Sequence, residues 1–152
     1  MFTEKIKYVR LAEFEDLEEI SRLMIEVFSS QMQAFYNEEG GASLLRLLSL
    51  RSLQKRFLED NRFYVYELNN KLEAVLELEH PCHIAFLFVQ TPGKGIANCL
   101  CDEVLTKTKE EIATVGAFSQ AIGFYTKLGF EKVSKEELVS GIPFTLMAKR
   151  LV

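Results

Sequence analysis

The sequence predicts an α/β fold in which one mixed β-sheet carries helices on both faces. The chain of 152 residues is 48% hydrophobic, which suffices for a single domain, residues 1–152, with a sizeable core. Segments of helical and of strand periodicity alternate along it, without repeats, low-complexity runs or a linker. Residues 84–89 form a continuous apolar run, which is typical of a strand with both faces buried in the middle of a sheet.

The N-terminal segments fit a strand followed by a helix. Residues 5–10 suit a strand, and residues 14–29 place apolar side chains at helical spacing. Neither Ala12 nor Glu13 is a favoured capping residue, so the start of this helix is weakly marked.

A second helical region follows. The pair Gly40–Gly41 is expected to separate it from the first helix, and it covers residues 44–48 and 53–58 with a break near Ser49. Its leucines more often fill a core than form an interface, although residues 38–58 could also supply a partner-facing surface.

A β-hairpin is expected next. Residues 62–68 and 72–79 alternate apolar and polar side chains on either side of Asn69 and Asn70. Two such residues are a signal for a tight turn between paired strands. The apolar strand over residues 83–89 comes after the hairpin.

The C-terminal half continues the alternation of helices and strands. The expected segments are a helix over 95–110, a strand over 112–115, a helix over 117–127, and strands over 130–133 and 144–151. Together with the hairpin, they complete the mixed sheet and its two helical layers.

Composition and charge exclude several function classes. The chain has 18 basic and 22 acidic side chains, a net charge of −4, whereas sequence-independent nucleic-acid binding needs a basic surface. Its apolar runs are too short to cross a bilayer, and the N-terminus lacks the apolar core of a signal peptide. We therefore expect a cytoplasmic protein with neither nucleic acid nor a membrane as partner.

The cysteines and histidines do not form a metal-binding pattern. Cys82, Cys99 and Cys101 have neither the spacing of a zinc site nor that of a disulfide framework, and we expect them to be small apolar fillers. His80 and His83 lie close to Cys82, but ligands so near along one strand and turn converge poorly on a metal. No metal is expected.

The most informative segment is the transition from the apolar strand into a helix at residues 93–97, Gly-Lys-Gly-Ile-Ala. Glycines let the backbone approach a ligand closely, and the free N–H groups of a first helical turn favour phosphate. The positions that the P-loop and dinucleotide-binding patterns require hold other residues. On this pattern alone, a turn with no ligand is as good an interpretation as an anion cradle.

A second motif lies further along the chain. Residues 121–130, Ala-Ile-Gly-Phe-Tyr-Thr-Lys-Leu-Gly-Phe, are typical of a short helix that ends at a glycine and enters a strand. In order and spacing, this motif and the glycine loop resemble the GCN5-related N-acetyltransferases, as do residues 9–12 near the start and 141–147 near the end. The resemblance covers most of the chain. It implies that family's acyl-CoA N-acyltransferase fold, with splayed central strands.

The same resemblance implies an N-acetyltransferase that moves the acetyl group of acetyl-CoA to a primary amine by direct attack in a ternary complex. The splayed strand would pair with the pantetheine arm, and the N–H groups of the loop would hold the pyrophosphate. The positions implied to bind acetyl-CoA are Phe88, Val89, Gln90, Gly93, Lys94, Gly95, Ile96, Ala97 and Gly116.

Catalytic roles are implied for a tyrosine and a carboxylate. Tyr125 matches the family's position for the acid that protonates the departing thiolate; the alternative is a packing residue with its hydroxyl at the surface. Glu77 and Glu79 are two residues apart on one strand, so they share a face, and either could deprotonate the substrate amine if burial raises its pKa. A solvated strand face is the alternative.

Two positions depart from the family's pattern. Pro92 stands at the first position of the phosphate loop, where it removes a backbone donor, and Gln90 is the nearby substitute. Gly116 stands where the family often has an asparagine that touches the pantetheine arm; it could keep a bulge there, while Phe118 would be bulky beside the cofactor channel. A catalytically impaired domain that binds a ligand or partner is therefore the alternative function, and an interaction module is a third.

The acceptor is expected to be a small amine or a protein amine. Residues 31–56 and the loop 135–142 would set its specificity, although neither contains a recognisable code. A homodimer is a further option that the sequence leaves open.

Overall fold

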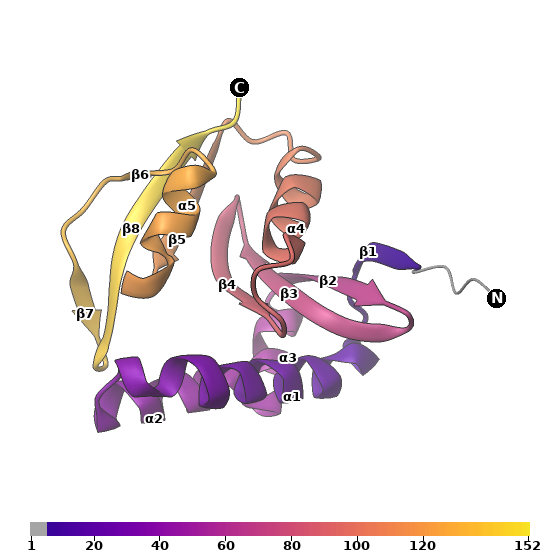
Figure 1. The fold of residues 1–152 in the computed structure, drawn as a ribbon, viewed down its shortest axis with the longest axis horizontal. Coiled ribbons are helices and arrows are strands. Elements are labelled where there is room, and N and C mark those ends of the chain that lie inside the picture. Colours follow the sequence, from indigo (N-terminus) through magenta and orange to yellow (C-terminus); the bar gives the residue numbers. More distant parts are fainter. Residues whose placement is uncertain (1–5) are drawn as a thin grey trace.

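The computed structural model describes residues 6–152 and confirms a mixed sheet with helices on both faces (Figure 1). Its strands run in the order β1-β2-β3-β4-β5-β8-β6, with β7 paired to β8, and β4 and β5 are parallel. They are β1 (Lys7–Leu11), β2 (Arg62–Leu68), β3 (Lys71–Glu79), β4 (His83–Val89), β5 (Ile112–Ala117), β6 (Glu131–Lys132), β7 (Glu137–Val139) and β8 (Ile142–Arg150). Lys5, expected in the first strand, lies outside the described residues.

The helices of the described chain form one layer on each face of the sheet (Figure 1). One layer holds α1 (Leu17–Val27), α2 (Glu38–Leu48) and α3 (Leu50–Leu58), and the other holds α4 (Ile96–Leu105) and α5 (Ile122–Lys127). Short 3₁₀ turns cover Phe14–Asp16, Gln33–Phe35 and Ser119–Ala121, and a π-helical turn covers Phe28–Met32. The sheet thus separates two hydrophobic cores. Within residues 6–152, no helix is long and apolar enough to cross a membrane.

The hairpin turn and the helix break fall where the sequence predicts them. Asn69 and Asn70 have positive φ angles of 53° and 65° and join β2 to β3 as a two-residue loop. Ser49 separates α2 from α3, and its hydroxyl accepts a hydrogen bond from the backbone N–H of Ser52, which caps α3.

Helix α1 is preceded by a capped 3₁₀ turn that the sequence only weakly indicates. The backbone N–H of Glu13 donates to the carboxylate of Asp16 at 2.7 Å. Arg10 donates to the same carboxylate and to Glu67, and its hydrogen bond lowers the pKa of Asp16. The ion pair fastens the edge strand β1 to the start of the helical layer.

The glycine pair Gly40–Gly41 lies inside α2, so the expectation that it separates two helices is wrong. Asn37 caps this helix by accepting a hydrogen bond from the N–H of Gly40 at 2.8 Å, and the helix therefore starts before both glycines. A Cβ at Gly40 would overlap the carbonyl oxygen of Gly141, in the turn between β7 and β8. The glycine permits a close backbone approach and does not break the helix.

Strand β7 lies within residues 135–142, which the sequence predicted as a loop. Ser140 and Gly141 have positive φ angles of 51° and 81°, and they allow a tight turn that pairs β7 with β8. Glycine marks such a turn, but serine does so only weakly, so the sequence gives little signal for this hairpin.

Helix α4 ends at Leu105 and not near residue 110 as expected. The hydroxyl and the N–H of Thr106 both donate to the carbonyl of Asp102, at 2.7 and 3.0 Å. Such side-chain bonds to the backbone compete with continued helix.

Strand β4 lies in the middle of the sheet, but the expectation that both its faces are buried along residues 84–89 is wrong. Only Ile84 and Phe88 of that run are fully buried. The reason is that β5 pairs with β4 only at His83 and Ile84, after which the two strands diverge (Figure 1). The divergence is the splayed arrangement that the family's fold implies.

We expect Gly40→Ala to lower the free energy of unfolding by about 1–3 kcal/mol, the usual cost of overpacking, because the new Cβ meets backbone atoms. Gly41→Ala is the matched control, since its Cβ would approach no nearer than 3.8 Å to Phe28 and it gains helix propensity. Urea unfolding of both variants measures the difference. Equal stability of the two variants would contradict the close contact.

Candidate functional site

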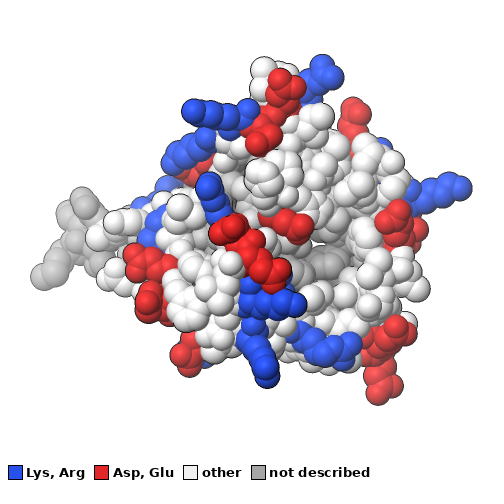
Figure 2. Space-filling model, turned by 180° about the vertical axis from the view of Figure 1, so that it is seen from behind, with Lys and Arg blue, Asp and Glu red and all other residues white. Residues whose placement is uncertain are grey.

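The divergence of β4 and β5 leaves one edge of β4 without a partner strand. From Phe86 to Val89, β4 keeps its register with β3 but has no pair on β5. Such an edge presents N–H and C=O groups that can bond to an extended ligand. Figure 2 shows the molecule from behind, with a hollow near its middle bordered mainly by uncharged residues and with acidic and basic side chains intermixed around it.

The loop between β4 and α4 has the geometry of an anion cradle. Gly93 and Gly95 have positive φ angles of 84° and 75°, a conformation that other residues adopt at a cost. Apart from its two neighbours along the chain, no residue of the described chain has a heavy atom within 4 Å of a Cβ built on either glycine, so the backbone is open to a ligand. Gly95 is the N-cap of α4 and lacks a capping side chain, which leaves the N–H groups of Ile96 and Ala97 free for an anion.

Gln90 directly follows β4, and hydrogen bonds of its backbone hold it in place. Its N–H donates to the carbonyl of Glu73 at 2.8 Å, and its carbonyl accepts from the amide of Gln31 at 2.9 Å. Its side-chain Oε1 is buried and has no hydrogen-bond partner within residues 6–152. A buried acceptor without a partner costs free energy, so this oxygen marks a place where a donor is missing.

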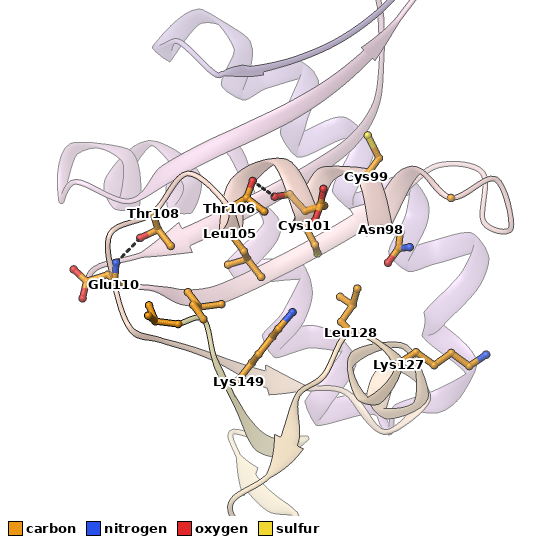
Figure 3. Close-up of a pocket in the computed structure, with 14 residues that line it drawn as sticks. Asn98, Cys99, Cys101, Leu105, Thr106, Thr108, Glu110, Lys127, Leu128 and Lys149 are labelled. Atoms are coloured by element: carbon orange, nitrogen blue, oxygen red, sulfur yellow. Dashed lines mark hydrogen bonds between the residues drawn. The ribbon is translucent and has the colours of Figure 1, made fainter.

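A cavity of about 730 Å³ lies beside the loop, between α4, the end of α5 and the end of β8 (Figure 3). Asn98 and Cys101 line it from α4, while Leu128 and Lys149 point into it from the other side. Burial raises the pKa of the Cys101 thiol to about 12, with the nearby Lys149 ammonium acting against it, so this thiol stays neutral. Sequence reasoning missed Asn98 and Lys149, because no motif connects these two positions.

Tyr125 lies on α5, in the core between the sheet and α4. Its ring meets those of Phe124 and Phe130 edge-on, with centroids 5.1 and 5.5 Å away. Burial, and to a lesser extent Cys101, raises the pKa of its hydroxyl, so the proton is held at ordinary pH. Tyr125 is 5% exposed and therefore a buried residue of this core.

The two carboxylates expected as candidate bases have different surroundings. Glu77 is fully buried against α3: Arg56 donates to both carboxylate oxygens, at 2.6 and 3.0 Å, and Asn61 donates to Oε2 at 2.7 Å. Glu79 is exposed at the end of β3. Glu77 is therefore not part of a solvated strand face, and Tyr125 packs on the opposite face of the sheet.

Gly116 lies on β5 in unbroken register with β8, so it forms no bulge in this pairing. Its direct partner is Leu146. A Cβ at Gly116 would come within 3.3 Å of the Phe144 ring, which fills the space beside it. The position therefore offers neither a side-chain contact nor a kink.

The ring of Phe118 packs on the face of the sheet that α1, α2 and α3 cover. Its centroid is 5.9 Å from that of Tyr36, whose hydroxyl accepts a hydrogen bond from Gln120 at 3.1 Å. Burial raises the pKa of Tyr36. Sequence reasoning missed Tyr36 and Gln120, since a polar contact between two irregular segments leaves no periodic signal.

Of the residues considered for metal binding, His83 has a hydrogen-bond partner of another kind. His83 shares a hydrogen bond of 2.8 Å with the hydroxyl of Thr114, and burial lowers the pKa of its ring. Across residues 6–152, no group of three His, Cys, Asp or Glu side chains could hold a metal ion.

Comparison with known proteins gives one family and many similar folds. The family model described as Acetyltransferase (GNAT) domain matches residues 32–151. None of the curated proteins matches significantly. A GCN5-related N-acetyltransferase from Rhodopseudomonas palustris has a TM-score of 0.84 at 20% identity over 94% of each chain.

Two further solved structures share the fold at similarly low identity. The PaiA N-acetyltransferase from Thermoplasma acidophilum, solved in complex with coenzyme A, has a TM-score of 0.77 at 21% identity, over 95% of this chain and 99% of that one. A chimera of the spermidine N-acetyltransferase SpeG from Vibrio cholerae and hSSAT has a TM-score of 0.65 at 16% identity, over 95% of each chain. Because the family model spans most of the sequence and the divergent strands fit it, the chain belongs to the GNAT acetyltransferase domain family.

Proposed function

We propose that the chain is an acetyl-CoA-dependent N-acetyltransferase that transfers the acetyl group to a primary amine by direct attack in a ternary complex. The observation that carries this proposal is the open glycine loop at the end of a strand that has left its neighbour. Membership of the GNAT family supports it, and so does the likeness to an N-acetyltransferase solved with coenzyme A.

The residues present fit acetyl-CoA. The N–H groups of Gly93–Ala97 would hold the pyrophosphate, and the exposed Lys94 would add a positive charge. The free edge of β4 at Phe88 and Val89 would pair with the amides of the pantetheine arm. The unpartnered Oε1 of Gln90 suits an amide donor near that edge. The thioester supplies an acyl group that is activated toward an amine.

Tyr125 would act as the general acid. When the neutral amine attacks, the C–N bond forms and the C–S bond breaks, so the sulfur leaves as a thiolate that needs a proton. The raised pKa keeps the Tyr125 hydroxyl protonated, so it can serve as a proton donor. The proton that the nitrogen loses passes to solvent, and solvent restores the hydroxyl.

The role of Glu77 or Glu79 as general base stays a prediction. Both oxygens of Glu77 already accept hydrogen bonds, and Glu79 lies at the end of β3 that pairs with the start of β4, away from the divergence. Deprotonation of the ammonium by bulk solvent, before the amine binds, is the alternative.

We propose a small amine or a protein amine as acceptor, selected by residues 31–56 and 135–142. These segments touch one another, since Ser43 donates to the carbonyl of Ser140 at 2.7 Å beside the contact of Gly40 with Gly141. A cytoplasmic location and a homodimer stay predictions.

A catalytically impaired, ligand-binding domain is the second candidate. It is favoured by Gly116, which offers no side chain toward a pantetheine arm, and by Phe144, whose ring lies 3.3 Å from a Cβ built there. This candidate predicts that coenzyme A binds without turnover.

Calorimetric titration is expected to show coenzyme A binding to the unmodified chain and none to Gly95→Leu, because the leucine would fill the open space over the loop. Leucine at positive φ costs about 1–2 kcal/mol of strain. Asn70→Leu, at φ 65° in the β2–β3 turn, is the control for that strain and should keep binding. An unmodified chain that does not bind millimolar coenzyme A would overturn the proposed function.

Tyr125→Phe is expected to lower kcat by about 10²–10⁴-fold, nearer the lower figure because a thiolate is a fair leaving group. The KM for acetyl-CoA and the unfolding temperature should not change, since the ring contacts with Phe124 and Phe130 remain. Tyr66→Phe, at another buried tyrosine of the same core, is the control and should keep full kcat. Full kcat in Tyr125→Phe, with chemistry rate-limiting, would leave Tyr125 as a packing residue.

Because the pKa of Tyr125 is raised, we expect that deprotonation of this residue does not lower kcat/KM at alkaline pH. A group whose pKa is raised keeps its proton to higher pH, so the acid stays active at the ordinary tyrosine pKa of about 10. The kcat/KM value should rise with pH as the neutral fraction of the amine grows. A fall centred at or below about pH 10 that disappears in Tyr125→Phe would contradict this reasoning.

A further inference from the structure

A buried ion pair connects α3 to the centre of the sheet. The side chain of Glu77 is 0% exposed and that of Arg56 is 19% exposed. The guanidinium forks onto the carboxylate through Nε and Nη2, and Asn61 supplies a third donor. All three hydrogen bonds therefore come from α3 and the segment that follows it.

The guanidinium of Arg56 also reaches strand β4. Its Cζ lies 5.4 Å from the centroid of the Phe86 ring, within range of a cation–π contact. Phe86 pairs in register with Glu77 across the β3–β4 ladder, and its ring stacks on that of Phe88 at 5.9 Å. One arginine thus holds a carboxylate of β3 and an aromatic ring of β4.

Phe86 occupies the first paired position after the divergence begins. Ile84 pairs with Leu78 of β3, and Phe86 pairs with the adjacent Glu77. Ala85 is therefore an extra residue on β4, as in a β-bulge. The pairing with β5 ends at Ile84. Beyond it, β4 is held by β3 on one side and by the groups packed on its faces, among which is Arg56.

Stability alone does not account for such a pair. Removing two charges from water costs about as much as their attraction returns, and apolar side chains of similar volume are often as stable. What apolar side chains cannot supply is the geometry: a planar guanidinium forks onto a carboxylate and lies over an aromatic ring at the same time.

We propose that Arg56 and Glu77 are positioning residues that set the course of β4 beyond Ile84 through Phe86, and with it the edge that meets the acyl donor. This inference rests on the proposed function. In this role both residues act through the strand and not on the reacting atoms.

The test is the double variant Arg56→Met with Glu77→Leu, compared with the unmodified chain. Its unfolding temperature should be unchanged or higher. Its affinity for coenzyme A, measured by calorimetry, should fall about tenfold, and the amides of residues 86–89 should exchange faster with deuterium. Arg56→Lys keeps the charge but loses the fork and the stacking, and should weaken binding in the same direction.

Arg10→Met is the matched control, because Arg10 also forks between two carboxylates but lies on β1, away from the divergence. It should lose stability and keep its affinity for coenzyme A. If the double variant does not fold, Arg56→Lys gives the same test.

The outcomes separate the hypotheses. Unchanged affinity and unchanged exchange at residues 86–89 in the double variant or in Arg56→Lys would overturn the positioning role. The positioning role would also be overturned if Glu77→Gln kept its affinity for coenzyme A but lost kcat. That result would favour Glu77 as a general base. An unmodified chain that does not bind coenzyme A would overturn the proposed function instead, and the exchange measurement would still decide whether Arg56 holds β4.

Discussion

The parallel pairing of β4 and β5 ends at Ile84, and the arrangement of the candidate site depends on this interruption. A strand inside a sheet normally satisfies its backbone groups on both sides, but β4 has only β3 beyond this residue. The helical layers on both faces keep the strand in place while one edge stays open. At the end of that edge lie the unpartnered oxygen of Gln90 and the glycine loop.

The sequence predicted the fold best where a residue's own backbone preference decides the structure. Asn69 and Asn70 favour positive φ, and Ser49 caps a helix, so the hairpin and the helix break could be placed from local signals. Gly40 was misplaced because its role depends on Gly141, which is distant in the chain. The apolar run 84–89 was placed correctly in the sheet, but no periodicity reveals that a neighbouring strand turns away.

The candidate site divides in the same way. Two glycines before a helix are a local signal, and the structure places them in an open loop at the end of β4. The spacing of Glu77 and Glu79 suggested that either could act as a base. In the structure, Arg56 of α3 binds the carboxylate of Glu77, whereas Glu79 is exposed to solvent. The position of Tyr125 in the family's motif came from resemblance. Its burial depends on how the chain packs, including contacts with the rings of Phe124 and Phe130, which belong to the same motif. The motif alone does not reveal that packing.

The contact between Gly40 and Gly141 has a consequence for how the length of this chain can vary. Surface turns are usually where a protein accepts extra residues. The turn at Ser140 and Gly141 cannot do so, because α2 meets its backbone directly and Ser43 holds its carbonyl. An added residue there would lift the β7–β8 hairpin from α2, so insertions on this side belong in the exposed stretch at residues 135–136, before β7 begins.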